Sequence, residues 1–207
     1  MTDKPSLLLA AAILAAAPLA AISAEAPEHV PFSELRKGPV AGSFTESKIM
    51  PGAERALETR GSFMTSPQKL CWKMEKPFVK AFEFSDGTAR AKAPGGVVRT
   101  IEAGGPGRLI ADLLSGLASG GLEGVKDDFT LASEEKTSDG FVYELTPQSA
   151  MMKKALRSVR LTTAGGRFSE FSIADQGGGS TVMKFSGTGE LSPEQFDSEF
   201  PRFCDVH

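Results

Sequence analysis

Side chains that could act in catalysis or hold a metal ion are scarce in this 207-residue chain. The two histidines, His29 and His207, lie near the ends of the sequence expected to form the domain, so neither a zinc site nor a histidine-based triad is expected. The sequence also lacks a Walker loop, a dinucleotide fingerprint, a Cys-x-x-Cys pair and the Gly-x-Ser-x-Gly pattern of serine hydrolases. We therefore expect neither an enzyme nor a protein that depends on a metal or another cofactor.

Charged side chains gather at three points, in patterns that favour solvated surface over a reaction site. Asp127-Asp128 and Glu134-Glu135 are pairs of adjacent carboxylates. Adjacent residues of a strand point to opposite faces, which makes each pair a poor acid and base couple. A basic run follows, which is a solvated face or, in a second interpretation, a docking site for an acidic partner or anionic lipid head groups. The run comprises Lys153, Lys154, Arg157 and Arg160.

The composition is that of an ordinary globular domain. Hydrophobic residues make up 41% of the chain and charged residues 24%, which excludes a disordered chain and a protein with several membrane spans. The net charge of −3 lacks the basic surplus that phosphate binding requires, so no nucleic-acid partner is expected. The aromatic residues are 14 Phe, one Trp and one Tyr, a set that suits an oily interior better than a wet recognition surface. A plain Phe-rich core is one explanation of this set.

Residues 1–24 have the pattern of a secretory signal peptide. Lys4 precedes the uncharged, Ala- and Leu-rich residues 7–22, and cleavage is expected after Ala24, with Ala26 as a second candidate. The alternative, a retained membrane anchor, is disfavoured because the run is shorter than the roughly 20 apolar residues of a spanning helix and Pro18 interrupts it. Residues 25–207 should therefore form a single domain in the periplasm.

The only two cysteines of the chain fit an oxidising compartment. Cys71 lies in an apolar, strand-like run beside Trp72, whereas Cys204 lies close to the C-terminus. A disulfide between them would tie the end of the chain to the body of the domain. Two buried free thiols are the alternative.

Most of the remaining sequence predicts short strands. Apolar and polar residues alternate with a period of two between turn signals, as in Phe141, Tyr143 and Leu145, followed later by the Gly165-Gly166 turn. About eleven short strands joined by tight turns indicate an antiparallel meander that closes into a barrel or a strongly curved sheet. The expected strands are 39–49, 57–65, 69–74, 78–85, 88–93, 97–101, 128–134, 140–146, 157–163, 168–175 and 181–188.

A helical spacing interrupts the strand pattern between residues 106 and 120. Five apolar residues there follow the i, i+3, i+4 rule and give the predicted helix a dense apolar face. The helix either fills the sheet as ordinary core or covers one side of it. A shorter helix is expected over residues 31–37, with Phe32 facing inward. The five residues are Leu109, Ile110, Leu113, Leu114 and Leu117.

A series of short motifs runs through the chain in a definite order. The first half contains residues 40–46, Ser62-Phe63, Leu70-Cys71-Trp72, Lys76-Pro77 and Ser85-Asp86-Gly87. The second half contains residues 143–147 and Gly165-Gly166-Arg167-Phe168 with Phe171. Together these motifs resemble the periplasmic outer-membrane lipoprotein carrier (LolA-like) family over residues 40–200. The family's typical Arg before a Pro is replaced here by Ser66-Pro67, so an arginine latch between barrel and lid is not expected.

The resemblance implies a mainly β fold with α: an incomplete antiparallel β-barrel whose hydrophobic concave side is covered by a helical lid. It also implies a monomer that shelters acyl chains of lipoproteins in the periplasm. Loading would need inner-membrane releasing machinery, and delivery an outer-membrane acceptor. The leucine-rich helix is closer to a divergent branch of the family, so the cargo is either a lipoprotein or another envelope lipid.

We assign candidate binding residues on this basis. The five apolar residues of the 106–120 helix would fill the concavity when it is empty and rotate out when a lipid enters. An alternative function is that of a sensor or assembly factor that uses the same barrel to bind a protein partner. The expected wall residues of the cavity are Phe44, Phe63, Trp72, Phe82, Phe84, Phe141, Tyr143 and Phe171.

Overall fold

The computed structural model describes residues 30–85, 88–101 and 127–205. Eleven strands lie within them, and each bound falls within two residues of the range expected from the alternation of the sequence. The strands are β1 (Val40–Ile49), β2 (Leu57–Thr65), β3 (Lys69–Lys76), β4 (Lys80–Ser85), β5 (Thr88–Ala93), β6 (Val97–Ile101), β7 (Phe129–Lys136), β8 (Phe141–Pro147), β9 (Leu156–Ala164), β10 (Arg167–Asp175) and β11 (Ser180–Glu190).

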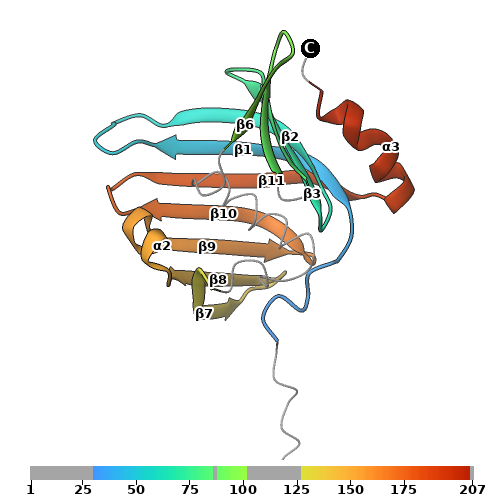
Figure 1. Cartoon of the computed structure of the whole chain (residues 1–207). Helices are drawn as coiled ribbons and strands as arrows, with labels where there is room; N and C mark the ends of the chain where they lie inside the picture. The colour runs from blue at the N-terminus through green and yellow to red at the C-terminus, as the bar shows by residue number, and fades with distance from the viewer. Residues whose placement is uncertain (1–29, 86–87, 102–126, 206–207) are drawn as a thin grey trace, which may run out of the picture.

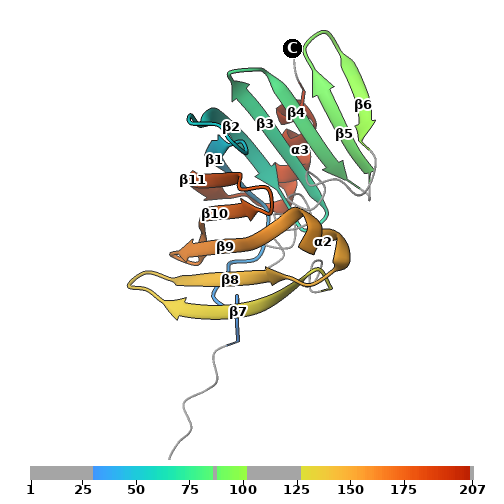
Figure 2. The same ribbon diagram turned by 90° about the vertical axis from the view of Figure 1, so that its left-hand side faces the viewer.

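All eleven strands belong to one curled antiparallel sheet (Figures 1 and 2). Their order is β6-β5-β4-β3-β2-β1-β11-β10-β9-β8-β7, so the pairing of β1 with β11 joins the two halves of the chain. The edge strands β6 and β7 do not pair with each other in the part of the chain that is described. The predicted incomplete barrel of about 11 strands is therefore confirmed.

Each strand gives one face to the inside of the curl and one to the outside. Phe63 of β2 lies opposite Trp72 of β3, and both belong to the large apolar cluster that we call the inner face. Met64 and Cys71, one position along, also lie opposite each other but belong to a second cluster on the outer face. The period-two alternation thus produces two separate cores.

Gly61 allows the inner face to pack against the backbone at the centre of the sheet. It lies opposite Phe44 in the register of β1 and β2, next to an irregularity in the pairing of β2 with β3. A Cβ atom at this position would collide with the carbonyl oxygen of Lys73 and come within 2.8 Å of the Phe44 ring. Glycine is therefore needed here for the close approach of an aromatic ring to a strand bulge.

Two helices complete the described structure, and the sequence analysis anticipated neither. α2 (Ala150–Ala155) connects β8 to β9. α3 (Pro193–Phe203) lies outside the curl beside β2 and β3 (Figure 1), where Phe196 and Phe200 enter the outer core. Ser192 and Gln195 form a capping box at its start, which explains why the helix begins there.

The prediction of a short helix over residues 31–37 is wrong. The segment forms turns, and Phe32 has a positive φ of 65°, which an α-helix does not accommodate. Phe32 nevertheless faces inward as expected, since it is buried in the inner core. The apolar character of Phe32 thus correctly predicted its burial, whereas the residue pattern of 31–37 did not correctly predict a helix.

Two expected segments lie outside the described residues. One is the signal peptide, residues 1–24. The other is the leucine-faced lid helix of residues 106–120.

A disulfide joins Cys71 of β3 to Cys204 at the end of α3, with Cα atoms 5.7 Å apart. Both cysteines are completely buried in the outer core. The bond fixes α3 against the sheet, as the pairing considered in the sequence analysis requires.

We predict that removing this disulfide destabilises the fold by about 2 to 5 kcal/mol, because the cross-link spans 133 residues of the unfolded chain. Urea unfolding of the native protein and of the variant Cys71→Ala with Cys204→Ala, each with and without reductant, measures the effect. Reductant should lower the midpoint of the native protein and leave that of the double variant unchanged. If reductant left the unfolding midpoint of the native protein unchanged, the predicted stabilisation by the disulfide would be wrong.

Candidate functional site on the inner face

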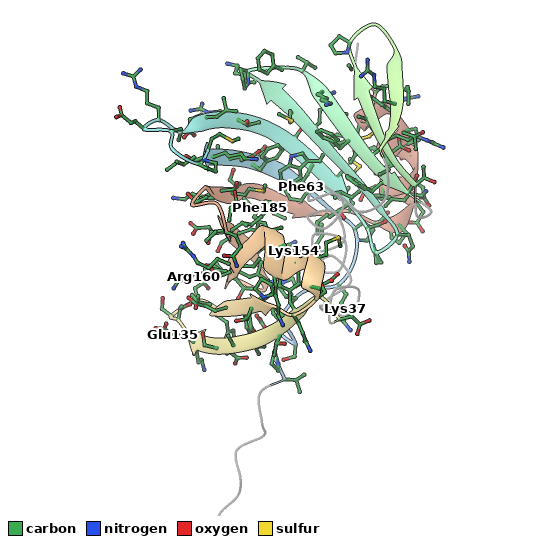
Figure 3. The ribbon with its side chains drawn as sticks, turned by 60° about the vertical axis from the view of Figure 1, so that its left-hand side comes forward. Lys37, Phe63, Glu135, Lys154, Arg160 and Phe185 are labelled. Atoms are coloured by element: carbon green, nitrogen blue, oxygen red, sulfur yellow. A yellow bond between two sulfur atoms is a disulfide. The ribbon has the colours of Figure 1, made fainter. Side chains whose placement is uncertain are left out.

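Four aromatic side chains from neighbouring strands meet at the centre of the inner face. The Phe44 ring stacks on Trp72 with centroids 3.7 Å apart. Phe63 and Phe185 meet edge to face at 5.6 Å (Figure 3), and Phe185 also contacts the edge of Trp72 at 6.2 Å. The four rings form a continuous apolar layer across β3, β2, β1 and β11, in which Phe44, Phe63 and Trp72 are buried in the present conformation.

A second aromatic group lies at the β8 side of the sheet. Phe141 and Tyr143 are two residues apart on β8, so they share the inner face, and their ring centroids are 5.8 Å apart. Phe32 packs on Tyr143 at 4.0 Å. This group anchors the segment that enters the sheet, residues 30–37, which we call the N-terminal strap.

The structure brings all eight predicted wall residues into the inner core or into contact with it. Five are buried: Phe44, Phe63, Trp72, Tyr143 and Phe171. Phe82, Phe84 and Phe141 are partly buried against the same cluster. Their common face follows from the strand register, and their part in binding a ligand stays a prediction.

A cavity of about 60 Å³ lies between the N-terminal strap and one end of the sheet. Small-molecule sites usually enclose about 300–1,000 Å³, so this space admits only a few atoms in the present conformation. Of the predicted wall residues only Phe63 lines it. The lining consists of Leu35, Arg36, Val40, Phe63, Thr65, Gly166, Arg167, Phe168, Phe185 and Thr188.

The sequence analysis missed Phe185, Phe168 and Leu35 as lining residues. Phe185 could have been found, because Thr181, Met183 and Phe185 alternate along β11 on the same face as Phe44. Leu35 could not, since its position depends on the long-range contacts of the strap.

Buried and partly buried hydrogen bonds hold the strap on the sheet. The Tyr143 hydroxyl donates to Glu34 Oε1 at 2.8 Å and accepts from the backbone N–H of Phe32 at 3.1 Å. The Thr163 hydroxyl lies 3.1 Å from the same carboxylate oxygen. Burial raises the pKa of the Tyr143 phenol, so it keeps its proton and remains a donor.

An exposed ion pair closes the end of the strap. Glu190 Oε1 lies 2.6 Å from Arg167 and 3.2 Å from Arg36. The hydrogen bond from Arg36 makes the largest contribution to lowering the pKa of the Glu190 carboxyl, and the charge of Arg167 lowers it further. The backbone N–H of Arg36 also donates to the carbonyl of Gly166, where a positive φ of 76° turns the β9–β10 hairpin. The strap is therefore fixed over the cavity by both backbone and side-chain bonds.

On β1, the other end of the inner face is polar. Glu46 follows Phe44 by two positions on β1 and lies opposite Thr59 and Met183 in the two neighbouring strands. Burial raises the pKa of its carboxyl, an effect that the nearby charge of Lys48 partly offsets. The apolar surface therefore runs from the strap to a pair of charged side chains.

The described residues contain no group of three or more His, Cys, Asp or Glu side chains that could hold a metal ion. Among the same residues, no helix has the length and apolar character to cross a bilayer.

Several solved structures are similar to this chain. A LolA superfamily protein from Nitrosomonas europaea has a TM-score of 0.45 and 12% identity over 82% of this chain and 94% of that one. A DUF1329 family protein from Desulfovibrio piger has a TM-score of 0.46 and 15% identity, covering 77% and 90% of the two chains. The MucA/MucB complex from Pseudomonas aeruginosa has a TM-score of 0.41 and 11% identity, over 80% of this chain and 57% of that one.

These matches include the family that the sequence resembles, and at such identities the similarity concerns the fold alone. No protein-family model matches the sequence, and no curated protein does.

We predict that Tyr143→Phe weakens the attachment of the strap and lowers the free energy of unfolding by about 1 to 3 kcal/mol, because the Phe32 N–H loses its buried acceptor and Glu34 a donor. Urea unfolding of Tyr143→Phe, Glu34→Gln and the double variant measures the loss. The two single effects should sum to more than the effect of the double variant, since both act on one bond. Strictly additive effects would contradict the shared bond.

Proposed function

We propose that this protein is a periplasmic carrier that shelters an acyl chain of a lipoprotein or another envelope lipid on its inner face and delivers it to the outer membrane. The observation that carries the proposal is the continuous apolar surface formed by Phe44, Phe63, Trp72 and Phe185 on an open sheet. The cavity beneath the strap prolongs this surface at one end. Glu46 and Lys48 would lie near the polar end of the cargo at the other.

The small size of the cavity fits a carrier that is closed while empty. A chain of about sixteen carbons would gain roughly 13 kcal/mol of transfer free energy on leaving water, at about 0.8 kcal/mol per methylene. Such a cargo would not leave an open, preformed pocket quickly. If the protein must first displace its own side chains, that cost lowers the net affinity and permits delivery.

The lid helix is the expected competitor for the inner face. In the proposal, Leu109, Ile110, Leu113, Leu114 and Leu117 occupy the space that the cargo takes and move aside when it enters. Because they lie outside the described residues, this role rests on the helical spacing of the sequence.

Transport between two membranes requires partners on both sides. The proposal includes cleavage of the signal peptide after Ala24, loading by releasing machinery at the inner membrane and transfer to an acceptor at the outer membrane. It includes no catalytic step, so the cargo should be recovered chemically intact. The supporting sequence features are the signal pattern of residues 1–24 and the scarcity of catalytic side chains.

Native mass spectrometry of the protein purified from the periplasm is the first test. The proposal predicts adducts of lipid or lipoprotein mass that disappear when the protein is denatured. A spectrum free of lipid together with a stoichiometric protein partner would instead support a sensor or assembly factor and overturn the carrier.

We predict that Phe185→Ser lowers the affinity for an acyl chain about tenfold or more, because one apolar contact of the inner face is lost. Phe203→Ser is a matched control, since Phe203 is also partly buried but packs against the outer core. Binding of a fluorescent fatty acid to both variants is compared with that of the native protein. Equal losses of affinity would contradict binding on the inner face.

We predict that Leu113→Asp with Leu117→Asp changes both loading and delivery of cargo, because charged side chains cannot compete for an apolar surface. The amount of lipid that co-purifies and its rate of transfer to acceptor vesicles are the measurements. Unchanged values for both would contradict the lid assignment and leave the wall assignment standing.

A further inference from the structure

Exposed apolar side chains gather at one end of the sheet. In an antiparallel sheet successive connections alternate between two ends, so residues 49–57, 76–80, 93–97, 147–156 and 175–180 all lie at the same end. We call these five segments the hairpin rim. Three of them, the β1–β2 loop, the β10–β11 loop and α2, are visible along the left-hand side of Figure 1.

Six of the eight large apolar residues that are exposed in the described structure belong to the hairpin rim. Phe78 has 72% of its surface exposed, more than any of the others. The six are Ile49, Met50, Leu57, Phe78, Val79 and Met151. The remaining two, Val30 and Val98, lie outside the rim as defined. The exposed apolar side chains of the described residues are therefore concentrated at one end of the sheet.

The hairpin rim carries an excess of basic side chains, although the chain as a whole has a net charge of −3. The five segments contain five basic side chains and two acidic ones, Glu54 and Asp175, and the residues before β7 place Asp127 and Asp128 at the same end of the sheet. Among the described residues Arg55, Lys153 and Lys154 form no ion pair, so their charge is available to a partner. The five basic residues are Arg55, Lys76, Lys80, Lys153 and Lys154.

We propose that the hairpin rim docks this protein onto the surface of an anionic lipid bilayer. The basic side chains would contact the head groups, while Phe78, Val79 and the other exposed apolar residues would enter the interface between the head groups and the acyl chains. An anionic membrane attracts a surface that carries both basic and apolar groups. An acidic protein partner would require the basic groups alone.

The spacing of the apolar groups favours a bilayer over a protein partner. Neighbouring strands are about 4.8 Å apart, so the β1–β2 and β3–β4 loops are separated by about 10 Å, and α2 lies about three strands from β1 on the other side. A protein partner would need a packed, contiguous apolar patch at the centre of the interface. A fluid bilayer accepts separate side chains one at a time.

Docking in this way goes beyond the carrier function and does not depend on it. The strap closes the opposite end of the inner face through Phe32, Leu35 and Arg36. The charged end of that face, at Glu46 and Lys48, is the end nearest the hairpin rim. A docked protein would therefore hold the end of its inner face that carries Glu46 and Lys48 toward the membrane.

Vesicle co-sedimentation of the purified, delipidated protein tests the proposal. Vesicles of phosphatidylglycerol with phosphatidylethanolamine should bind it at low ionic strength and release it at high ionic strength, whereas pure phosphatidylcholine should bind it weakly. Phe78→Ser with Val79→Ser should lower the partition constant at least about tenfold. Lys153→Gln with Lys154→Gln should lower it about 25-fold, at roughly fivefold for each lysine.

Matched controls lie away from the rim. Val30→Ser replaces an apolar residue whose exposure lies between those of Phe78 and Val79, and Lys37→Gln with Arg202→Gln removes two exposed charges, so each should change binding less than about twofold. No binding to anionic vesicles at low ionic strength would overturn the proposal, as would equal losses in rim and control variants. Because the protein is delipidated, the result of this experiment does not depend on whether mass spectrometry finds a lipid cargo.

Discussion

The stacking of Phe44 on Trp72 over a glycine at the centre of the sheet is the contact on which the inner face depends. The Phe44 ring of β1 reaches across β2 to the Trp72 ring of β3, because Gly61 of β2 has no side chain to fill the space between them. The stack also lies next to the pairing of β1 with β11, where the two halves of the chain meet. An apolar surface that spans both halves follows from this single arrangement.

The two faces of the sheet are stabilised in different ways. The outer core is small and is fixed by α3 and the disulfide between Cys71 and Cys204, which leaves it little freedom to rearrange. The inner core is larger and mostly apolar, and its cavity is bounded by a strap whose Phe32 and Glu34 form hydrogen bonds with Tyr143 of the sheet.

Much of the sheet follows from local pattern, since alternation such as Phe141, Tyr143 and Leu145 fixes both the strand and the face that it buries. The missed helix α3 had a readable signal in Ser192 and Gln195, which form a capping box around Pro193. The strap could not be derived in the same way, because Phe32 adopts a positive φ for contacts with β8, more than a hundred residues later. The cavity could not be predicted either, as it depends on where that strap lies.

Trp72 offers a direct test of whether an acyl chain occupies the inner face, because it is the only tryptophan of the chain. The measurement is quenching of its fluorescence during titration with a fatty acid that carries bromine atoms at the middle of its chain. The account predicts saturable quenching at one acyl chain per protein, since the bromines would lie against the Trp72 ring. Binding of the fatty acid that leaves Trp72 fluorescence unchanged would place the ligand elsewhere and contradict the account.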